Sequence, residues 1–74
     1  MVESTANPLA EAKKAEGNQA FKARNYQQAI TLFTEALNIE PSEQILSNRA
    51  AAYILENQFR LAVQDCQAGI RINN

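Results

Sequence analysis

The sequence has no histidine and no tryptophan, and it contains a single cysteine. A zinc site of the usual kind needs several histidine or cysteine ligands, and a histidine-dependent catalytic triad needs its general base. The sequence also lacks a glycine-rich phosphate loop. We therefore expect no metal, no cofactor and no catalytic residues, and an interaction module rather than an enzyme.

The sequence also has no excess of charge of one sign and no long apolar run. Seven basic and eight acidic residues give a net charge of −1, which leaves no basic field for nucleic acid or an anionic membrane. No apolar stretch is long enough to span a bilayer, and the first seven residues do not resemble a signal peptide. A small secreted domain usually relies on disulfides, which a single thiol cannot supply. These observations favour a soluble, cytoplasmic protein that binds neither nucleic acid nor membranes.

Glycine and proline are scarce, with two of each, whereas the sequence has thirteen alanines. Alanine has the highest helix propensity and glycine and proline the lowest, so the composition predicts an all-α fold. Apolar residues recur with a helical period over about 8–23, 26–39, 43–56 and 58–72. Because the connections are short, we expect consecutive helices to be antiparallel neighbours.

Short polar residues and the two prolines mark the ends of these predicted helices. Asparagine and serine side chains cap a helix by accepting backbone N–H bonds, and proline suits the first helical position but disfavours helix at the residue before it. Asn25, with Gln28 three residues later, resembles a capping box. The other signals are Asn7-Pro8 at the first start, Glu40-Pro41-Ser42 before the third helix and Glu56-Asn57-Gln58 before the fourth.

The sequence matches itself when it is shifted by 33 residues, as from Gly17 to Ala50. Matching at a fixed period is typical of stacked repeats, because each unit packs against its neighbour in the same way. Gly17 and Ala29, repeated as Ala50 and Ala62, are small positions that allow two helices to approach closely. The other matched pairs are Tyr26/Phe59, Ile30/Val63, Phe33/Cys66, Ala36/Gly69, Leu37/Ile70 and Ile39/Ile72.

The first unit resembles a tetratricopeptide repeat nearly in full, and the second unit shares the pattern. The resemblance implies two helical hairpins in a right-handed stack. We expect a disordered tail over residues 1–7 and one domain over 8–74, with repeats at about 10–42 and 43–74. The residues that carry the resemblance are Gly17-Asn18-Gln19-Ala20-Phe21, Tyr26, Ala29, Ile30, Phe33, Ala36, Leu37 and Pro41 in the first unit, and Ala50, Tyr53, Phe59, Ala62 and Gly69 in the second.

Two features depart from the family pattern. The spacing is one residue shorter than the usual 34, which predicts a shortened turn near Ser42-Glu43. The turn glycine of the family is replaced by Arg24 in the first unit and by Asn57 in the second. Asparagine tolerates a left-handed backbone and arginine does not, so we expect the first turn to be strained or differently shaped.

In this family the first helices of successive repeats line a groove, so their exposed faces are the candidate binding surface. Lys14 and Asn18 stand four residues apart and share a face, and Asn48 lies on the neighbouring first helix. An ammonium and two carboxamides suit a carboxylate ligand, because they combine attraction with directed hydrogen bonds. The predicted peptide-binding residues are Lys14, Asn18 and Asn48, together with Lys22, Ala51 and Leu55.

Two strings, Lys14-x-x-Gly17-Asn18-x-x-x-Lys22 and Ser47-Asn48-Arg49-Ala50-Ala51-Ala52-Tyr53, resemble the dicarboxylate-clamp subclass of these repeats. The resemblance implies a co-chaperone adaptor that binds the C-terminal Glu-Glu-Val-Asp tails of seventy- and ninety-kilodalton heat-shock chaperones through Lys14, Asn18 and Asn48. The subclass has two further clamp residues, both cationic, on a third repeat that this sequence lacks. Losing two charge-assisted hydrogen bonds of roughly 1.5–3 kcal/mol each would weaken micromolar binding to millimolar or worse.

Two alternatives remain open. Repeats bury their apolar faces against the next unit, and nothing C-terminal covers the last helix here. Stacking or domain swapping of two chains would bury this face and make a homo-oligomer. In the other alternative, the chain is the N-terminal module of a larger protein that binds a different folded partner, and the clamp residues are remnants. The residues expected to be uncovered are Val63, Cys66 and Ile70, with Tyr53 and Leu55.

The remaining candidates are assigned structural roles. Arg49 lies about 100° around the helix from Asn48, so we expect an inter-helix salt bridge rather than a ligand contact. Cys66 occupies the repeat position of Phe33, which predicts a buried and inert thiol. The aromatic residues stand at packing positions and are expected in the core; they are Phe21, Tyr26, Phe33, Tyr53 and Phe59.

Overall fold

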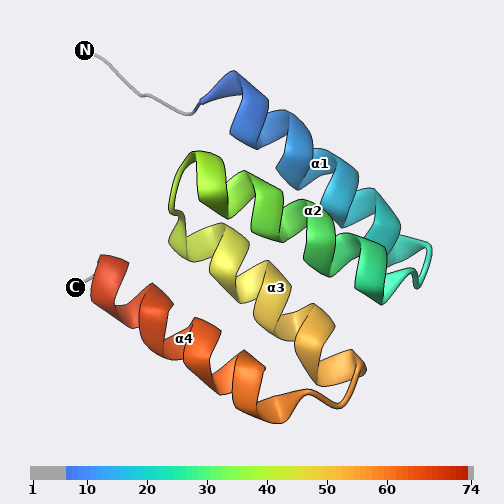
Figure 1. The fold of residues 1–74 in the computed structure, drawn as a ribbon, viewed down its shortest axis with the longest axis vertical. Coiled ribbons are helices and arrows are strands. Elements are labelled where there is room, and N and C mark those ends of the chain that lie inside the picture. Colours follow the sequence, from blue (N-terminus) through green and yellow to red (C-terminus); the bar gives the residue numbers. More distant parts are fainter. Residues whose placement is uncertain (1–6, 74) are drawn as a thin grey trace.

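The computed structural model describes residues 7–73, which form four helices joined by short turns (Figure 1). All helix ends lie within one residue of the predicted ranges, and the all-α prediction is confirmed. Residues 1–6, which hold most of the predicted tail, lie outside the described residues. The helices are α1 (Pro8–Lys22), α2 (Tyr26–Ile39), α3 (Glu43–Leu55) and α4 (Phe59–Asn73).

The four helices stack in chain order as two antiparallel hairpins (Figure 1). The first hairpin is α1 with α2, the second is α3 with α4, and the hairpins join through α2 and α3. As a result α1 and α3 run in the same direction and also contact each other. Within the described chain, α4 contacts α3 and no other helix. None of the helices in residues 7–73 has the length and apolar character required to cross a bilayer.

Two of the three predicted helix caps are present. The Asn7 side chain accepts hydrogen bonds from the backbone N–H groups of Leu9 (2.9 Å) and Ala10 (3.3 Å), and Ser42 Oγ accepts one from Ile45 at 3.4 Å. The capping box at Asn25 is wrong, because this side chain makes no cap hydrogen bond. The ψ of Asn25 is 74°, whereas Asn7 and Ser42 have ψ values of 123° and 130°. A cap residue needs an extended backbone for its side chain to reach the N–H groups of the helix, and Asn25 departs from it.

The turns within the two hairpins have the same shape. Arg24 has a φ of 68° and Asn57 a φ of 62°, both in the left-handed region. Each turn closes with the same pair of backbone hydrogen bonds, which in the first hairpin run from Arg24 to Phe21 and from Asn25 to Ala20. The first turn is therefore not differently shaped. Arg24 instead adopts a left-handed conformation that costs an L-residue roughly 1–2 kcal/mol. Of the two expectations for this turn, strain is therefore the one that holds.

The core lies where small residues let α1 and α2 pack closely, with α3 covering the other side of α2. Phe33 is fully buried and packs in a cluster with Ala20 of α1 and Ile45 of α3. A Cβ placed on Gly17 would lie only 2.6 Å from Cε1 of the Phe33 ring. The prediction that these positions allow close approach is confirmed, and the alanines at the other small positions are also buried: Ala29, Ala50 and Ala62.

Two predicted core residues of α4 are exposed. The Phe59 side chain is 57 % exposed, and the Cys66 thiol is exposed rather than buried, so both predictions are wrong. Their repeat counterparts in α2 lie between α1 and α3, whereas α4 has a neighbour on one side only within residues 7–73. The expected uncovered face is confirmed at Val63 and Ile70, which are 54 % and 68 % exposed.

The other predicted core aromatics lie at the edges of the core. Phe21 packs against the buried cluster and makes an edge-to-face contact with Tyr26, with ring centroids 5.3 Å apart. Tyr53 is half-buried and lies beneath the guanidinium of Arg49. Each of these rings therefore closes one side of the core rather than filling its centre, the place that Phe33 takes.

Candidate peptide-binding site

Two polar side-chain pairs connect α1 to α3 along one face of the stack. Lys14 Nζ donates a hydrogen bond to Gln44 Oε1 at 3.0 Å, and Asn48 Nδ2 donates one to Asn18 Oδ1 at 3.2 Å. The two pairs lie one helical turn apart, because each helix contributes residues that are four positions apart. The structure thus brings Lys14, Asn18 and Asn48 together on one face of the stack.

A small cavity of about 150 Å³ continues this row of residues along the helices. Its walls are the carboxamides of Asn18 and Asn48, the ring of Phe21 and the methyl group of Ala51. The cavity therefore offers hydrogen-bonding groups beside an apolar surface. The sequence predicts Phe21 as a core residue only, although it stands three residues after Asn18 and so shares its face.

The Lys14 ammonium already has two partners among the described residues. Besides Gln44 it contacts Glu11 Oε1 at 3.1 Å, one turn earlier on α1. The Lys14 side chain is 18 % exposed and that of Glu11 is 48 % exposed. Neither partner was predicted from the sequence, although Glu11 stands three residues before Lys14 and Gln44 stands four residues before Asn48.

The remaining predicted binding residues lie apart from the cavity. Lys22 is the last residue of α1 and is exposed, and Leu55 is the last residue of α3 and is 50 % exposed. Because α1 and α3 run in the same direction, both lie at the same end of the groove (Figure 1). Neither side chain lines the cavity.

Comparison with known proteins identifies the repeat. Residues 10–43 match the family model described as tetratricopeptide repeat. The chain belongs to the tetratricopeptide-repeat family. The crystal structure of the Sgt2 tetratricopeptide-repeat domain from Aspergillus fumigatus superposes with a TM-score of 0.88 at 38 % identity, covering 92 % of this chain and 46 % of that one.

Two curated relatives of this tetratricopeptide-repeat chain are much longer proteins. A DnaJ homolog subfamily C member 7 homolog from Dictyostelium discoideum is 44 % identical over 68 residues, which cover 85 % of this chain and 13 % of the relative. Hsp70-Hsp90 organizing protein 3 from Arabidopsis thaliana is 43 % identical over 60 residues, covering 80 % of this chain and 11 % of the relative. The chain therefore spans only a small part of the length of these relatives.

Arg49 connects three helices of the tetratricopeptide-repeat pair, away from the groove. Its Nε and Nη2 donate to the two carboxylate oxygens of Asp65 at 2.8 and 2.6 Å, and its Nη1 donates to Thr34 Oγ1 at 3.0 Å. The hydrogen bonds to Asp65 raise the pKa of Arg49 despite its partial burial, so the guanidinium stays charged. The predicted inter-helix salt bridge is confirmed; its buried acidic partner, Asp65, had not been singled out.

Lys13, the residue before Lys14 on α1, is paired with α2 rather than with α3. Lys13 Nζ lies 2.9 Å from Glu35 Oε1 of α2, and the hydrogen bond to Glu35 raises the pKa of Lys13. Lys13 and Lys14 are adjacent in sequence but are paired in different directions, one with α2 and one with α3. Lys13 is thus a natural control for any experiment on Lys14.

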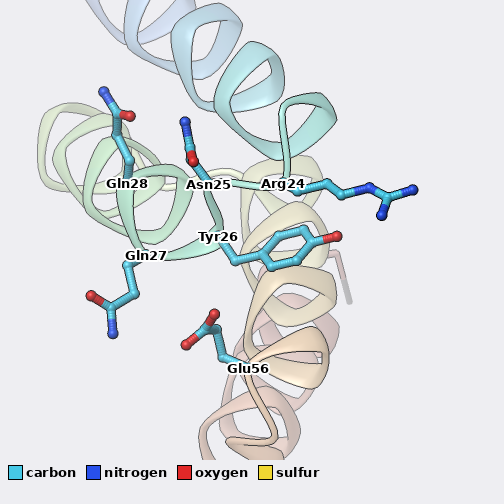
Figure 2. Close-up of a pocket in the computed structure, with 6 residues that line it drawn as sticks. All are labelled: Arg24, Asn25, Tyr26, Gln27, Gln28 and Glu56. Atoms are coloured by element: carbon cyan, nitrogen blue, oxygen red, sulfur yellow. The ribbon is translucent and has the colours of Figure 1, made fainter.

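A second hollow, of about 440 Å³, lies beside the turn between α1 and α2 (Figure 2). Its lining is polar, and the guanidinium of Arg24 points away from the amide side chains of the same hollow (Figure 2). The side chains drawn in Figure 2 point in different directions, whereas those of Lys14, Asn18 and Asn48 lie together in the groove. The lining residues are Arg24, Asn25, Tyr26, Gln27, Gln28 and Glu56.

Proposed function

We propose that this chain is a cytoplasmic, non-enzymatic adaptor of the co-chaperone type, whose groove between α1 and α3 binds the C-terminal carboxylates of a heat-shock chaperone tail. One observation carries the proposal: an ammonium and two carboxamides lie side by side on facing helices. The name of one relative, an Hsp70-Hsp90 organizing protein, supports the choice of partner. The free thiol of Cys66 suits a reducing compartment such as the cytoplasm.

The three groups have distinct roles in this proposal. The Lys14 ammonium attracts a carboxylate and donates a charge-assisted hydrogen bond to it. A carboxamide has two N–H donors, so Asn48 keeps one after bonding to Asn18, and Asn18 keeps its own. The adjacent cavity of about 150 Å³ has room for a small aliphatic side chain next to the carboxylate. A tail of the Glu-Glu-Val-Asp kind offers both features.

Binding by this chain alone is expected to be weak. The two further cations of the clamp subclass have no counterpart in the sequence, and each would contribute a charge-assisted hydrogen bond of roughly 1.5–3 kcal/mol. We expect a dissociation constant in the millimolar range, which a chemical-shift titration by NMR can follow.

Lys14→Ala is expected to lower the affinity for a peptide with a free terminal carboxylate about tenfold or more, because a charge-assisted hydrogen bond is lost. Asn48→Ala should act in the same direction, and amidating the peptide terminus should weaken binding to the wild-type chain similarly. NMR titration of the isotope-labelled chain measures each dissociation constant. Lys13→Ala is the matched control, because it removes the same charge from a side chain paired with Glu35. Equal affinities for the free and amidated peptides would contradict the proposal.

Self-association is a second candidate function, favoured by the exposed face of α4. Phe59, Val63 and Ile70 are each more than half exposed and lie on one side of the helix together with Cys66. A contiguous apolar face of this kind marks an interaction surface. A second chain, or a partner with a complementary apolar face, would bury it.

Val63→Glu and Ile70→Glu are expected to remove any concentration-dependent increase in size. Sedimentation of the wild-type chain over a hundredfold range of concentration should show a larger species at the upper end, and the charged variants should remain monomeric. Leu9→Glu is the control, since Leu9 is 59 % exposed on α1, at the other end of the stack. A wild-type chain that is folded and monomeric throughout the range would rule out self-association.

A further inference from the structure

The Lys14 ammonium has two acceptors of different charge, and these contacts have opposite consequences for a ligand. Gln44 Oε1 is 3.0 Å from Nζ and Glu11 Oε1 is 3.1 Å from it. Gln44 is neutral and belongs to α3, so it holds the ammonium toward the facing helix without offsetting its charge. Glu11 is anionic and belongs to α1, so it offers Lys14 the same group that a peptide terminus would offer.

A ligand carboxylate therefore approaches an ammonium group that is already paired with the carboxylate of Glu11. The Lys14–Glu11 pair has no net charge, and a second carboxylate beside it is repelled by Glu11 at short range. The side chain of Glu11 is 48 % exposed and has room to leave, whereas that of Lys14 is only 18 % exposed and is held by Gln44. Binding must therefore displace Glu11 into solvent or tolerate it as a neighbour, and both lower the affinity.

We propose that Glu11 is an internal competitor of the ligand carboxylate and that Gln44 positions Lys14 for binding. The proposal rests on the proposed function, because it concerns the same groove and the same ligand class, a peptide with a free terminal carboxylate. The number of carboxylates next to Lys14 sets the affinity of the groove. Removing Glu11 leaves a net positive site, and adding an acid at Gln44 makes a net negative one.

The experiment is an NMR titration of the full 74-residue chain with a peptide that ends in a free carboxylate, repeated with the same peptide amidated. Glu11→Gln is expected to bind the free carboxylate about two- to fivefold more tightly than wild type, the effect of removing one exposed ion pair. Gln44→Glu is expected to bind the free carboxylate more weakly by at least the same factor. An acidic residue near the start of α3 stabilises the helix, so the weaker binding would not come from unfolding. With the amidated peptide the three chains should differ by less than twofold.

Glu16→Gln is the matched control, because it makes the same change of net charge on α1 but lies on a face away from Lys14. Its affinity should equal that of wild type. If Glu16→Gln tightens binding as much as Glu11→Gln, the effect is one of net charge and the competitor role is wrong. If Glu11→Gln leaves the affinity unchanged while Lys14→Ala still lowers it, the inference fails and the proposed function stands. If Lys14→Ala has no effect either, the proposed function itself fails.

Discussion

An Arg49→Ala variant is expected to lose about 3 kcal/mol of its free energy of unfolding, a large part of the roughly 4–11 kcal/mol expected for a domain of 74 residues. The substitution removes three hydrogen bonds that connect α3 to α2 and α4. It also leaves the carboxylate of Asp65, whose side chain is 6 % exposed, without its counter-charge. Because the Arg49 side chain is 18 % exposed, water reaches part of the site, and we expect the lower end of the range of about 3–5 kcal/mol for breaking a buried pair.

Urea unfolding followed by circular dichroism at 222 nm measures this loss. Arg49→Lys keeps the charge but not the two parallel hydrogen bonds, and it should lie between wild type and Arg49→Ala. The double variant Arg49→Met/Asp65→Leu should be more stable than Arg49→Ala, because it leaves no unpaired charge in the interior. A loss of less than about 1 kcal/mol for Arg49→Ala, the value of an exposed ion pair, would show that the pair does not hold the hairpins together.

A Gly17→Ala variant is expected to be less stable by about 2 kcal/mol, although alanine is the better helix former. The added Cβ would lie 2.6 and 2.7 Å from Cε1 and Cδ1 of the Phe33 ring. That ring is fully buried, so it cannot yield without moving its neighbours. Overpacking of this kind costs up to about 3 kcal/mol, and the gain of about 1 kcal/mol in helix propensity offsets only part of it.

Gly69→Ala is the matched control, because Gly69 is also a buried helical glycine but has more room. A Cβ there would meet Glu43 Cγ at 3.5 Å, an ordinary contact. We therefore expect Gly69→Ala to gain about 0.5–1 kcal/mol in the same urea experiment. The double variant Gly17→Ala/Phe33→Leu should recover part of the loss if the ring causes it. Equal effects of the two glycine substitutions would show that the closeness of α1 and α2 is not what requires Gly17.

Much of the fold could be predicted because its signals are local or periodic. The caps at Asn7 and Ser42 act within one helical turn, and the 33-residue period identified Gly17 and Ala29 as small positions where helices pack closely. The cap at Asn25 failed because the left-handed residue before it, Arg24, sets the path of the chain into α2. A capping signal predicts a helix start, and here the turn determines the geometry of that start.

The candidate site was predictable in part for the same reason. Helical spacing alone placed Lys14 with Asn18 on one face, and the facing position of Asn48 came from the family resemblance. Gln44 was not predicted as a partner of Lys14, because a contact between α1 and α3 joins residues 30 positions apart. The sequence gives no distance between two such helices, and so it did not show that Gln44 reaches the ammonium. Glu11 lies one turn before Lys14 on the same helix, so helical spacing was sufficient to predict its contact with the ammonium.

The sequence by itself determined four helices, their order and the small positions that allow them to stack, because propensity, capping and periodicity act along the chain. Only the tertiary structure decided which apolar positions are covered. Phe33 and Cys66 are equivalent in the repeat, yet one is fully buried and the other is exposed. The reason is physical: burial depends on a second surface, and within the described residues α2 has a helix on both sides whereas α4 has one on a single side.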